Sequence, residues 1–293
     1  MDFRALETFV WIARLGSFRA AAQRMYATQP SISSRIANLE RELGVQLFDR
    51  AGRRVSLTAR GRDMLDYAER LLALRGEMLR SVADPNAIQG SIRLGVVETI
   101  VYTWLPRLIE KVNEAYPAIT LELDVDTTVN LSDKLSKHEI DLALLMGPVN
   151  QPGITDRALC SYPLAWVASP AIELPAEPVP LATVTQWPII TYPRLTKPHA
   201  AIQALVGNEG RRARIHASSS LATIIRMTVD GIGVSALPRE IIEEELANGS
   251  LRVFRSEGPL PDLDFTVSYG ATPESSITRA VADLAVGVAG AHA

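Results

Sequence analysis

The chain has 293 residues, of which 47% are hydrophobic and 22% are charged, a composition typical of an ordinary globular protein. Its single cysteine, Cys160, excludes an internal disulfide and a two-cysteine redox switch within one chain. Charged residues interrupt the opening segment and no apolar run is long enough to span a membrane, so the sequence predicts a cytoplasmic protein.

Charge is distributed unevenly along the chain, although the formal net charge is only −3. Residues 1–60 contain ten arginines and five acidic residues, so the remaining residues carry a net charge of −8. A basic amino-terminal part on an acidic body is typical of a DNA-binding head.

The first 42 residues predict three helices. Apolar side chains recur at helical spacing over residues 3–15, which predicts an amphipathic first helix. Residues 17–42 predict a second helix, a tight turn and a third helix. Ser17 suits an N-cap, three consecutive alanines allow a second helix to cross closely, and Pro30 suits a first helical turn.

The third helix has two faces. Isoleucine and leucine side chains at helical spacing mark a buried face, and short polar groups with one arginine occupy the other. Such groups suit base edges and phosphates in a major groove, which is the logic of helix-turn-helix recognition. The alternative is a helical packing unit whose polar face is merely solvated. The candidate DNA-binding residues of this helix are Gln29, Pro30, Ser31, Ser33, Ser34 and Arg35.

A hairpin is predicted over residues 47–57, with its turn at Ala51 and Gly52. Arg50, Arg53 and Arg54 surround this turn. Three arginines make a basic wing that would reach phosphates or a minor groove, and this raises the odds of DNA binding.

The first sixty or so residues resemble the winged helix-turn-helix of LysR-type transcriptional regulators, without a gap. Many members carry arginine at the position of Ser34, whereas here Arg35 follows one position later. The resemblance implies an N-terminal all-α winged helix-turn-helix. It is carried by the alanine-rich second helix and by Gln29–Ser33, Leu39–Glu40, Leu43–Gly44, Leu47–Arg50 and Leu57–Gly61.

A long helix is predicted from Thr58 to about Val82, with an apolar stripe that repeats roughly every seven residues. About 25 residues at about 1.5 Å each span nearly 40 Å, and a helix of this length needs a partner for its apolar stripe. The resemblance implies an antiparallel pair of linker helices that builds a dimer. Packing on its own domain is the alternative. Residues 84–90 then predict a hinge.

Strands and helices alternate from Ser91 onward, which predicts parallel strand pairing and two α/β lobes with a crevice between them. This part resembles the effector-binding domain of the same family, which is similar to periplasmic solute-binding proteins, through residues 139–143 and 231–238. The predicted domains are the DNA-binding domain (1–60), the linker helix (58–83), the hinge (84–90) and the effector-binding domain (91–293). Within the last, lobe I takes 91–161 and 267–293, and lobe II takes 162–266.

Ligands in open α/β sheets bind beyond the carboxyl ends of strands, near helix N-termini, so strand ends supply the candidate effector residues. By resemblance, serine or threonine at the positions of Thr99 and Thr128 binds the effector. The alternative for each threonine is simple helix capping. The full set of candidates is Glu98, Thr99, Ile100, Thr127, Thr128, Met146, Tyr192, Arg194 and Ser219.

Glu98 is the unusual residue of this set, because a carboxylate in a water-poor crevice needs a cationic partner. It would meet a ligand amine or guanidinium, or pair with Arg194 across the crevice. We therefore hypothesise an effector that bears both an amine and a carboxylate, or another polar cation. The alternative is a solvated glutamate at the start of a helix.

The sequence thus predicts a DNA-binding transcriptional regulator controlled by a small molecule. The resemblance implies dimers of dimers on long, imperfectly two-fold operators, and RNA polymerase is a further candidate partner. No cofactor is expected, and the four histidines lack metal-ligand spacing. An enzyme would need a nucleophile or phosphate-binding motif that the sequence lacks. A solute-binding transport protein would explain two lobes but not the basic head.

Overall fold

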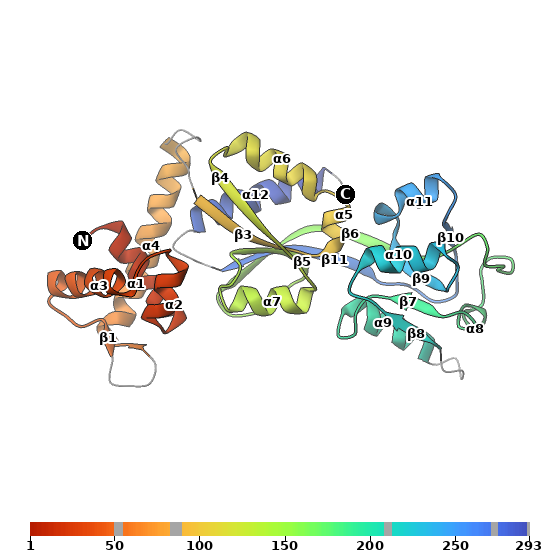
Figure 1. The fold of residues 1–293 in the computed structure, drawn as a ribbon, viewed down its shortest axis with the longest axis horizontal. Coiled ribbons are helices and arrows are strands. Elements are labelled where there is room, and N and C mark those ends of the chain that lie inside the picture. The colour runs from red at the N-terminus through yellow and green to blue at the C-terminus, as the bar shows by residue number, and fades with distance from the viewer. Residues whose placement is uncertain (50–54, 83–89, 208–212, 271–274, 292–293) are drawn as a thin grey trace.

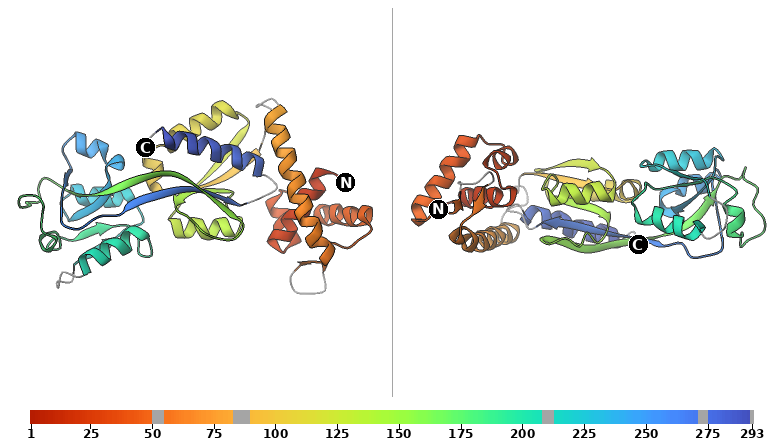
Figure 2. Two further views of the ribbon diagram at one scale, coloured as in Figure 1. Left: turned by 180° about the vertical axis from the view of Figure 1, so that it is seen from behind. Right: turned by 90° about the horizontal axis from the view of Figure 1, so that it is seen from below.

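The computed structural model describes residues 1–49, 55–82, 90–207, 213–270 and 275–291. A helical head lies at one end of an elongated molecule, and an α/β domain of two lobes forms the rest (Figure 1). Lobe I lies between the head and lobe II in all three views (Figures 1 and 2). This is the predicted fold class.

Each helix of the head begins at a side chain that accepts a hydrogen bond from the first turn. Asp2, Ser17 and Thr28 cap the three helices in this way, as expected for Ser17. A separate hydrophobic core joins the head to residues Ala68 and Leu72 of the following long helix. The elements of the head are α1 (Phe3–Leu15), α2 (Phe18–Arg24), α3 (Gln29–Leu43), β1 (Phe48–Asp49) and β2 (Ser56–Leu57).

The wing hairpin is present and is anchored to α3. β1 and β2 pair in antiparallel register, with Phe48 opposite Leu57. Glu40 of α3 accepts a hydrogen bond of 2.8 Å from the backbone N–H of Leu47, which ties the start of the hairpin to the helix. The tip of the wing, residues 50–54, lies outside the described residues, and with it the predicted DNA contacts Arg50, Arg53 and Arg54.

The long helix α4 (Ala59–Val82) has apolar side chains on two sides. One side packs on the head, because Ala68 and Leu72 are buried in the core that the head shares with α4. The other side is exposed and carries Tyr67, Leu71, Leu74, Met78 and Val82, a set we call the α4 stripe. Packing within the chain therefore accounts for only part of the apolar surface that the sequence predicted.

Lobe I has the parallel pairing that the sequence predicted, because its first strand is parallel to both the second and the third. α6 and α12 cover one face of the sheet and α7 covers the other (Figure 1). Its elements are β3 (Gly90–Val96), α5 (Glu98–Tyr102), α6 (Leu105–Ala115), β4 (Ile119–Val125), α7 (Thr128–Ser136), β5 (Leu142–Met146) and α12 (Ser275–Gly290).

Two long antiparallel strands, β6 (Ile154–Ala168) and β11 (Asp262–Gly270), run from lobe I into lobe II. They join both lobes into one sheet of order β4-β3-β5-β11-β6-β9-β7-β8, with β10 paired to β6, over a shared hydrophobic core. The other elements of lobe II are α8 (Leu181–Val184), β7 (Ile189–Thr191), α9 (Lys197–Gly207), β8 (Ile215–Ala217), α10 (Leu221–Val229), β9 (Val234–Pro238), a 3-10 turn (Arg239–Ile241), α11 (Glu243–Ala247) and β10 (Arg252–Phe254).

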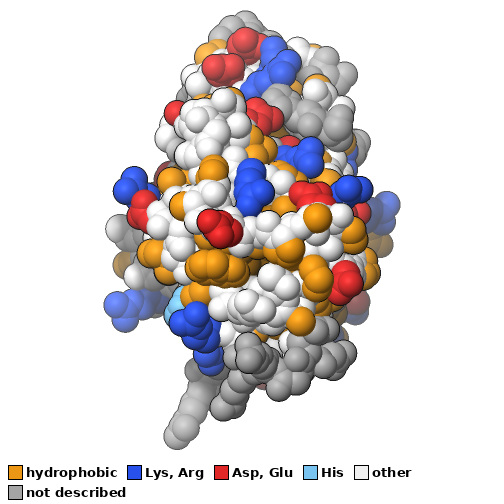
Figure 3. All heavy atoms as spheres, turned by 90° about the vertical axis from the view of Figure 1, so that its right-hand side faces the viewer, with side chains coloured by type: hydrophobic (Ala, Val, Ile, Leu, Met, Phe, Trp, Pro, Cys, Tyr) orange, Lys and Arg blue, Asp and Glu red, His pale blue; other side chains and the backbone are white. Residues whose placement is uncertain are grey.

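Charged side chains do not segregate by sign at the far end of lobe II, where lysine, arginine and acidic side chains are interspersed (Figure 3). Within the described residues, no helix has the length and apolar character needed to cross a membrane.

Candidate functional site

A cavity of about 460 Å³ lies between the two lobes. It opens at the carboxyl ends of β3, β4 and β5 and at the first residues of α7 and α10, which is where ligands bind in open α/β sheets. The structure brings most of the predicted effector residues together around this cavity. Those that line it are Glu98, Thr99, Thr127, Thr128, Met146, Tyr192 and Ser219.

Two predicted effector residues are placed differently. Ile100 is fully buried, because it lies two positions after Glu98 on α5 and the turn of the helix directs it into the core. Arg194 is exposed, and it is not among the residues that line the cavity. Its predicted ion pair with Glu98 is not formed in the structure.

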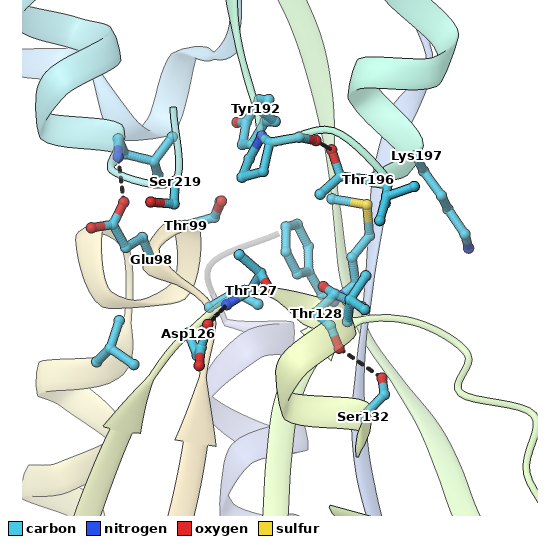
Figure 4. A pocket seen from close by; sticks show the side chains of 18 of the residues that line it. Glu98, Thr99, Asp126, Thr127, Thr128, Ser132, Tyr192, Thr196, Lys197 and Ser219 are labelled. Carbon is cyan, nitrogen blue, oxygen red and sulfur yellow. Dashed lines mark hydrogen bonds between the residues drawn. The ribbon is translucent and has the colours of Figure 1, made fainter. Parts of the chain in front are cut away.

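Glu98 instead joins the two lobes. Its Oε2 atom accepts a hydrogen bond from the backbone N–H of Leu221, the first residue of α10 (Figure 4). The first N–H groups of a helix have no partner within the helix, and the helix dipole favours a negative charge there. The sequence analysis expected a cationic partner for Glu98. The partial positive charge at the N-terminus of α10 takes part of that role.

Three hydroxyl groups gather near Glu98 at this side of the cavity, those of Thr99, Tyr192 and Ser219 (Figure 4). Thr99 is 3% exposed and Tyr192 is 8% exposed. Burial raises the pKa of Tyr192 well above its ordinary value, the nearby Thr99 side chain lowers the pKa in part, and the negative charge of Glu98 raises it, so the hydroxyl stays protonated. That buried hydroxyl has no hydrogen-bond partner among the described residues.

The opposite side of the cavity is formed by the start of α7. Thr127 caps this helix by accepting a hydrogen bond from the backbone N–H of Asn130. Thr128 has another role, because its hydroxyl accepts a hydrogen bond of 3.2 Å from the backbone N–H of Met146. This bond fixes α7 against the end of β5.

Asp126 also lines the cavity, and it shares one cation, Lys134, with Asp124. Lys134 lies 3.0 Å from its Oδ2 atom. Burial acts to raise the pKa of Asp126, but hydrogen bonds from Asn130, the Thr127 backbone and Lys134 outweigh it and leave the pKa below its ordinary value. Asp126 therefore stays ionised without any ligand, and Glu98 is the carboxylate that faces the cavity without a cationic side chain.

Lys197 lines the cavity and was not among the candidate residues that the sequence selected. It opens α9 in lobe II and lines the cavity on the side away from Glu98 (Figure 4). Its Nζ atom donates a hydrogen bond of 2.8 Å to the carbonyl oxygen of Gly147 in lobe I. Lys197 could have been selected from the sequence, because it lies at the start of a predicted helix, as do Thr99 and Thr128.

The candidate DNA-binding residues of α3 lie on its outer face. Gln29, Pro30 and Ser34 are exposed, and Ser31, Ser33 and Arg35 are half-buried. Three of the predicted apolar residues, Ile32, Ile36 and Leu39, form the buried face that holds the helix on the head, and Leu43 is exposed. Within the described residues, no cluster of three or more histidine, cysteine or acidic side chains has the arrangement of a metal site.

Two family models match the chain and together span most of its length. Residues 3–62 match the bacterial regulatory helix-turn-helix protein model of the lysR family, and residues 85–289 match the LysR substrate binding domain. The two matched segments correspond to the head and to the two-lobed domain.

Curated relatives and solved structures agree with these matches. The HTH-type transcriptional regulator DgdR of Burkholderia cepacia is 30% identical over 288 residues, covering 97% of this chain and 92% of DgdR. SoxR of Arthrobacter sp. (strain TE1826) is 26% identical over 255 residues, covering 87% of this chain and 86% of SoxR. A full-length OxyR variant from Pseudomonas aeruginosa has the same fold, with a TM-score of 0.62 at 24% identity over 97% of this chain and 94% of that chain.

Proposed function

Because the chain belongs to the LysR family of DNA-binding transcriptional regulators with an effector-binding domain, we propose that its effector is a small molecule bearing both an amine and a carboxylate. The family consists of regulators and not of enzymes, so the enzyme and transport alternatives are set aside. The observation that carries the proposal is the asymmetry of the cavity, which has Glu98 on one side and Lys197 on the other.

The Glu98 side of the cavity suits an ammonium group. An ammonium donates three hydrogen bonds, and a carboxylate has lone pairs for about four. The backbone N–H of Leu221 uses one of these, and the hydroxyl groups of Thr99, Tyr192 and Ser219 lie nearby on the same side of the cavity. Another polar cation of similar size would satisfy the same groups.

The Lys197 side suits a carboxylate. The N-terminus of α7 opens into the cavity and favours negative charge. Lys197 lines this side, but its ammonium extends away from the cavity to the carbonyl oxygen of Gly147, and a ligand carboxylate would have to draw it inward (Figure 4). Asp126 adds a negative charge that a ligand carboxylate would meet here, because Asp126 shares the single cation Lys134 with Asp124.

Thermal unfolding of the purified chain against amino acids, polyamines, and aliphatic and aromatic acids tests the proposal. A ligand at about 100 times its Kd stabilises the folded state by about 2.7 kcal/mol, which a melting curve detects. We expect a shift with an amine-bearing carboxylate that is lost in both Glu98→Gln and Thr99→Ala. The matched control is Glu114→Gln, which changes an exposed glutamate paired with Lys111 on the surface of α6.

Two outcomes would count against an amine-bearing effector. Stabilisation by plain acids that survives Glu98→Gln would keep the pocket at Thr99 and discard the amine. Equal binding of an amino acid by wild type and Glu98→Gln would have the same meaning, because the ammonium would then have no partner in the pocket.

We also propose that the chain acts in the cytoplasm as a dimer, and as a dimer of dimers on DNA, with RNA polymerase as a further partner. The α4 stripe supports the dimer, because it leaves apolar side chains exposed at a coiled-coil-like spacing. Two heads would then contact an imperfectly two-fold operator. The domain boundaries at residues 60, 83 and 90 stay predictions. The same holds for the DNA-reading roles of Gln29, Pro30, Ser31, Ser33, Ser34, Arg35, Arg50, Arg53 and Arg54.

A further inference from the structure

The head contacts lobe I through a buried ion pair that belongs neither to the pocket nor to the predicted DNA-reading face. Nη2 of Arg24, the last residue of α2, donates to Oδ1 of Asp141 at 2.7 Å, and the two side chains are 10% and 4% exposed. Oδ2 of the same carboxylate accepts from the backbone N–H of Arg93 at 2.9 Å. One carboxylate therefore connects the head to the first strand of lobe I.

Aromatic contacts extend this connection, which we call the seam. The guanidinium carbon of Arg24 lies 4.6 Å from the centre of the Trp11 ring, within the range of a cation–π contact. The ring of Trp11 also meets the ring of His138 edge to face, with 5.9 Å between centres. His138 belongs to lobe I, so α1, α2 and the loop before Asp141 form one continuous contact.

The seam and the pocket lie at opposite ends of the same two strands. Arg93 is in the first half of β3, and the end of β3 leads directly to Glu98 in the pocket. Asp141 immediately precedes β5, and β5 ends at Met146 in the pocket. β3 and β5 pair in parallel over Leu94–Val96 and Leu142–Leu144, and the backbone N–H of Asp141 donates to the carbonyl oxygen of Arg93. A displacement at the pocket end of this pair therefore reaches the seam through paired, buried strands.

We propose that Arg24, Asp141 and Arg93 are positioning residues for DNA binding, which hold the head at one orientation on lobe I. Head and lobe I then move as a single body, and lobe II is the part that moves relative to them when the pocket is filled. The seam thereby sets the angle and separation at which the two heads of a dimer meet the two halves of an operator. This inference rests on the membership of a DNA-binding family and on the seam itself, whatever the effector is.

His138 makes the seam sensitive to pH. Burial lowers the pKa of His138 first, and the positive charges of Arg14, Arg24 and Arg93 lower it further, while Asp141 opposes them. Docking therefore favours the neutral imidazole, whereas a head released from lobe I would leave His138 nearer its ordinary pKa of 6.5. The docked state is fully favoured above pH 6.5 and loses stability as the pH falls from there toward the lowered pKa.

Distances between spin labels on the full-length chain test the seam directly. Labels at Gln23→Cys and Ser136→Cys, both exposed, report on the head and lobe I when Cys160→Ser removes the native thiol. An excess of unlabelled chain keeps the measured distance within one subunit. We expect one narrow distance at pH 7.5, and an increase of about tenfold or more in the undocked fraction for Arg24→Gln. Arg24→Lys should restore docking in part, because it keeps the charge but loses the planar guanidinium.

DNA affinity distinguishes a positioning role of Arg24 from a purely structural one, because only a positioning role would affect a full site and a single half-site differently. On a duplex selected from a random pool by the wild-type protein, Arg24→Gln should bind about tenfold more weakly. Its affinity for a duplex carrying one half-site should stay at the wild-type value, because a single head needs no fixed orientation. Lowering the pH to 6 should widen the distances in wild type but not in His138→Gln.

The matched control is Arg255→Gln, which breaks an ion pair of 3.1 Å with Glu177 whose arginine is 81% exposed, and it should behave as wild type. Three results would overturn the proposal. These are an unchanged narrow distance in Arg24→Gln, an equal loss of affinity on the single half-site and the full site, or a pH response that persists in His138→Gln.

Discussion

Lys197 of lobe II donates a hydrogen bond of 2.8 Å to the backbone carbonyl of Gly147 in lobe I, on the side of the pocket away from the bond between Glu98 and Leu221. The lobes are thus bridged on both sides of the cavity by one charged side chain each, and each bridge ends on backbone of the other lobe. A ligand that satisfies these two side chains would compete with the bridges as well as fill the space between them.

Removal of the Lys197 bridge should loosen the lobes without harming the core. For Lys197→Met we expect a loss of about 1 kcal/mol, the usual worth of one such hydrogen bond, and a melting temperature lower by about 2–4 °C. Calorimetry measures the melting temperature, and small-angle scattering should show a larger radius of gyration. Lys111→Met, which breaks only the exposed pair with Glu114, is the control. Identical melting and scattering for both variants would refute the bridge.

The α4 stripe should carry the dimer. Leu74 is 62% exposed in the single chain, and Leu74→Asp would place a charge in the middle of an apolar contact between two helices. We expect sedimentation to show mostly monomer for this variant, with unchanged helix content. The control Asp66→Lys alters an exposed residue of α4 outside the stripe and should leave the dimer intact. A dimeric Leu74→Asp protein would place the interface elsewhere.

The wing should contribute charge and no sequence information. Arg53 lies outside the described residues, and its predicted role rests on the three arginines around the turn of the hairpin. Arg53→Ala should weaken binding to every duplex and reduce the slope of log K against log salt by about 0.9, the value for one lost phosphate contact. Affinity measured at several salt concentrations gives this slope, with Arg255→Ala as control. An unchanged slope would reject the wing assignment.

Gln29 should behave in the opposite way. It is exposed at the start of α3, where an amide reads a base edge by two hydrogen bonds. Gln29→Ala should cost about 1–3 kcal/mol of discrimination between a selected duplex and random DNA, while the salt slope stays constant. Competition binding measures this ratio, and Gln23→Ala on the exposed face of α2 is the control. Equal losses on both duplexes would argue against base reading.

Local sequence signals were sufficient for the elements and for much of the pocket. Thr99 and Thr128 each follow a strand and open a helix, and both line the cavity as predicted. The apolar periodicity of α3 placed Ile32, Ile36 and Leu39 on the buried face correctly, whereas Leu43, predicted on the same face, is 39% exposed. These signals act within a few residues, so they can be read without knowing which segments meet in the folded chain.

Contacts between distant segments were not predictable in this way. Arg194 was one of the partners considered for Glu98, beside a ligand cation. A backbone N–H has no signature in the sequence, and the structure uses that of Leu221. Arg24 and Asp141 are 117 positions apart. The local sequence around each of them gives no reason to expect a distant partner. Only the packing of the head on lobe I brings their charges together.

The long strands β6 and β11 limit how the two lobes can move. A strand of 15 residues at about 3.3 Å per residue extends about 50 Å, so β6 is a continuous ribbon that passes through both lobes with β11 beside it. A pair of strands can twist but does not stretch. The lobes can therefore rotate relative to each other more easily than they can separate. A small molecule in the pocket would therefore rotate one lobe relative to the other about β6 and β11. Because the subunit is elongated, a small rotation at the pocket would displace its far end by a larger distance.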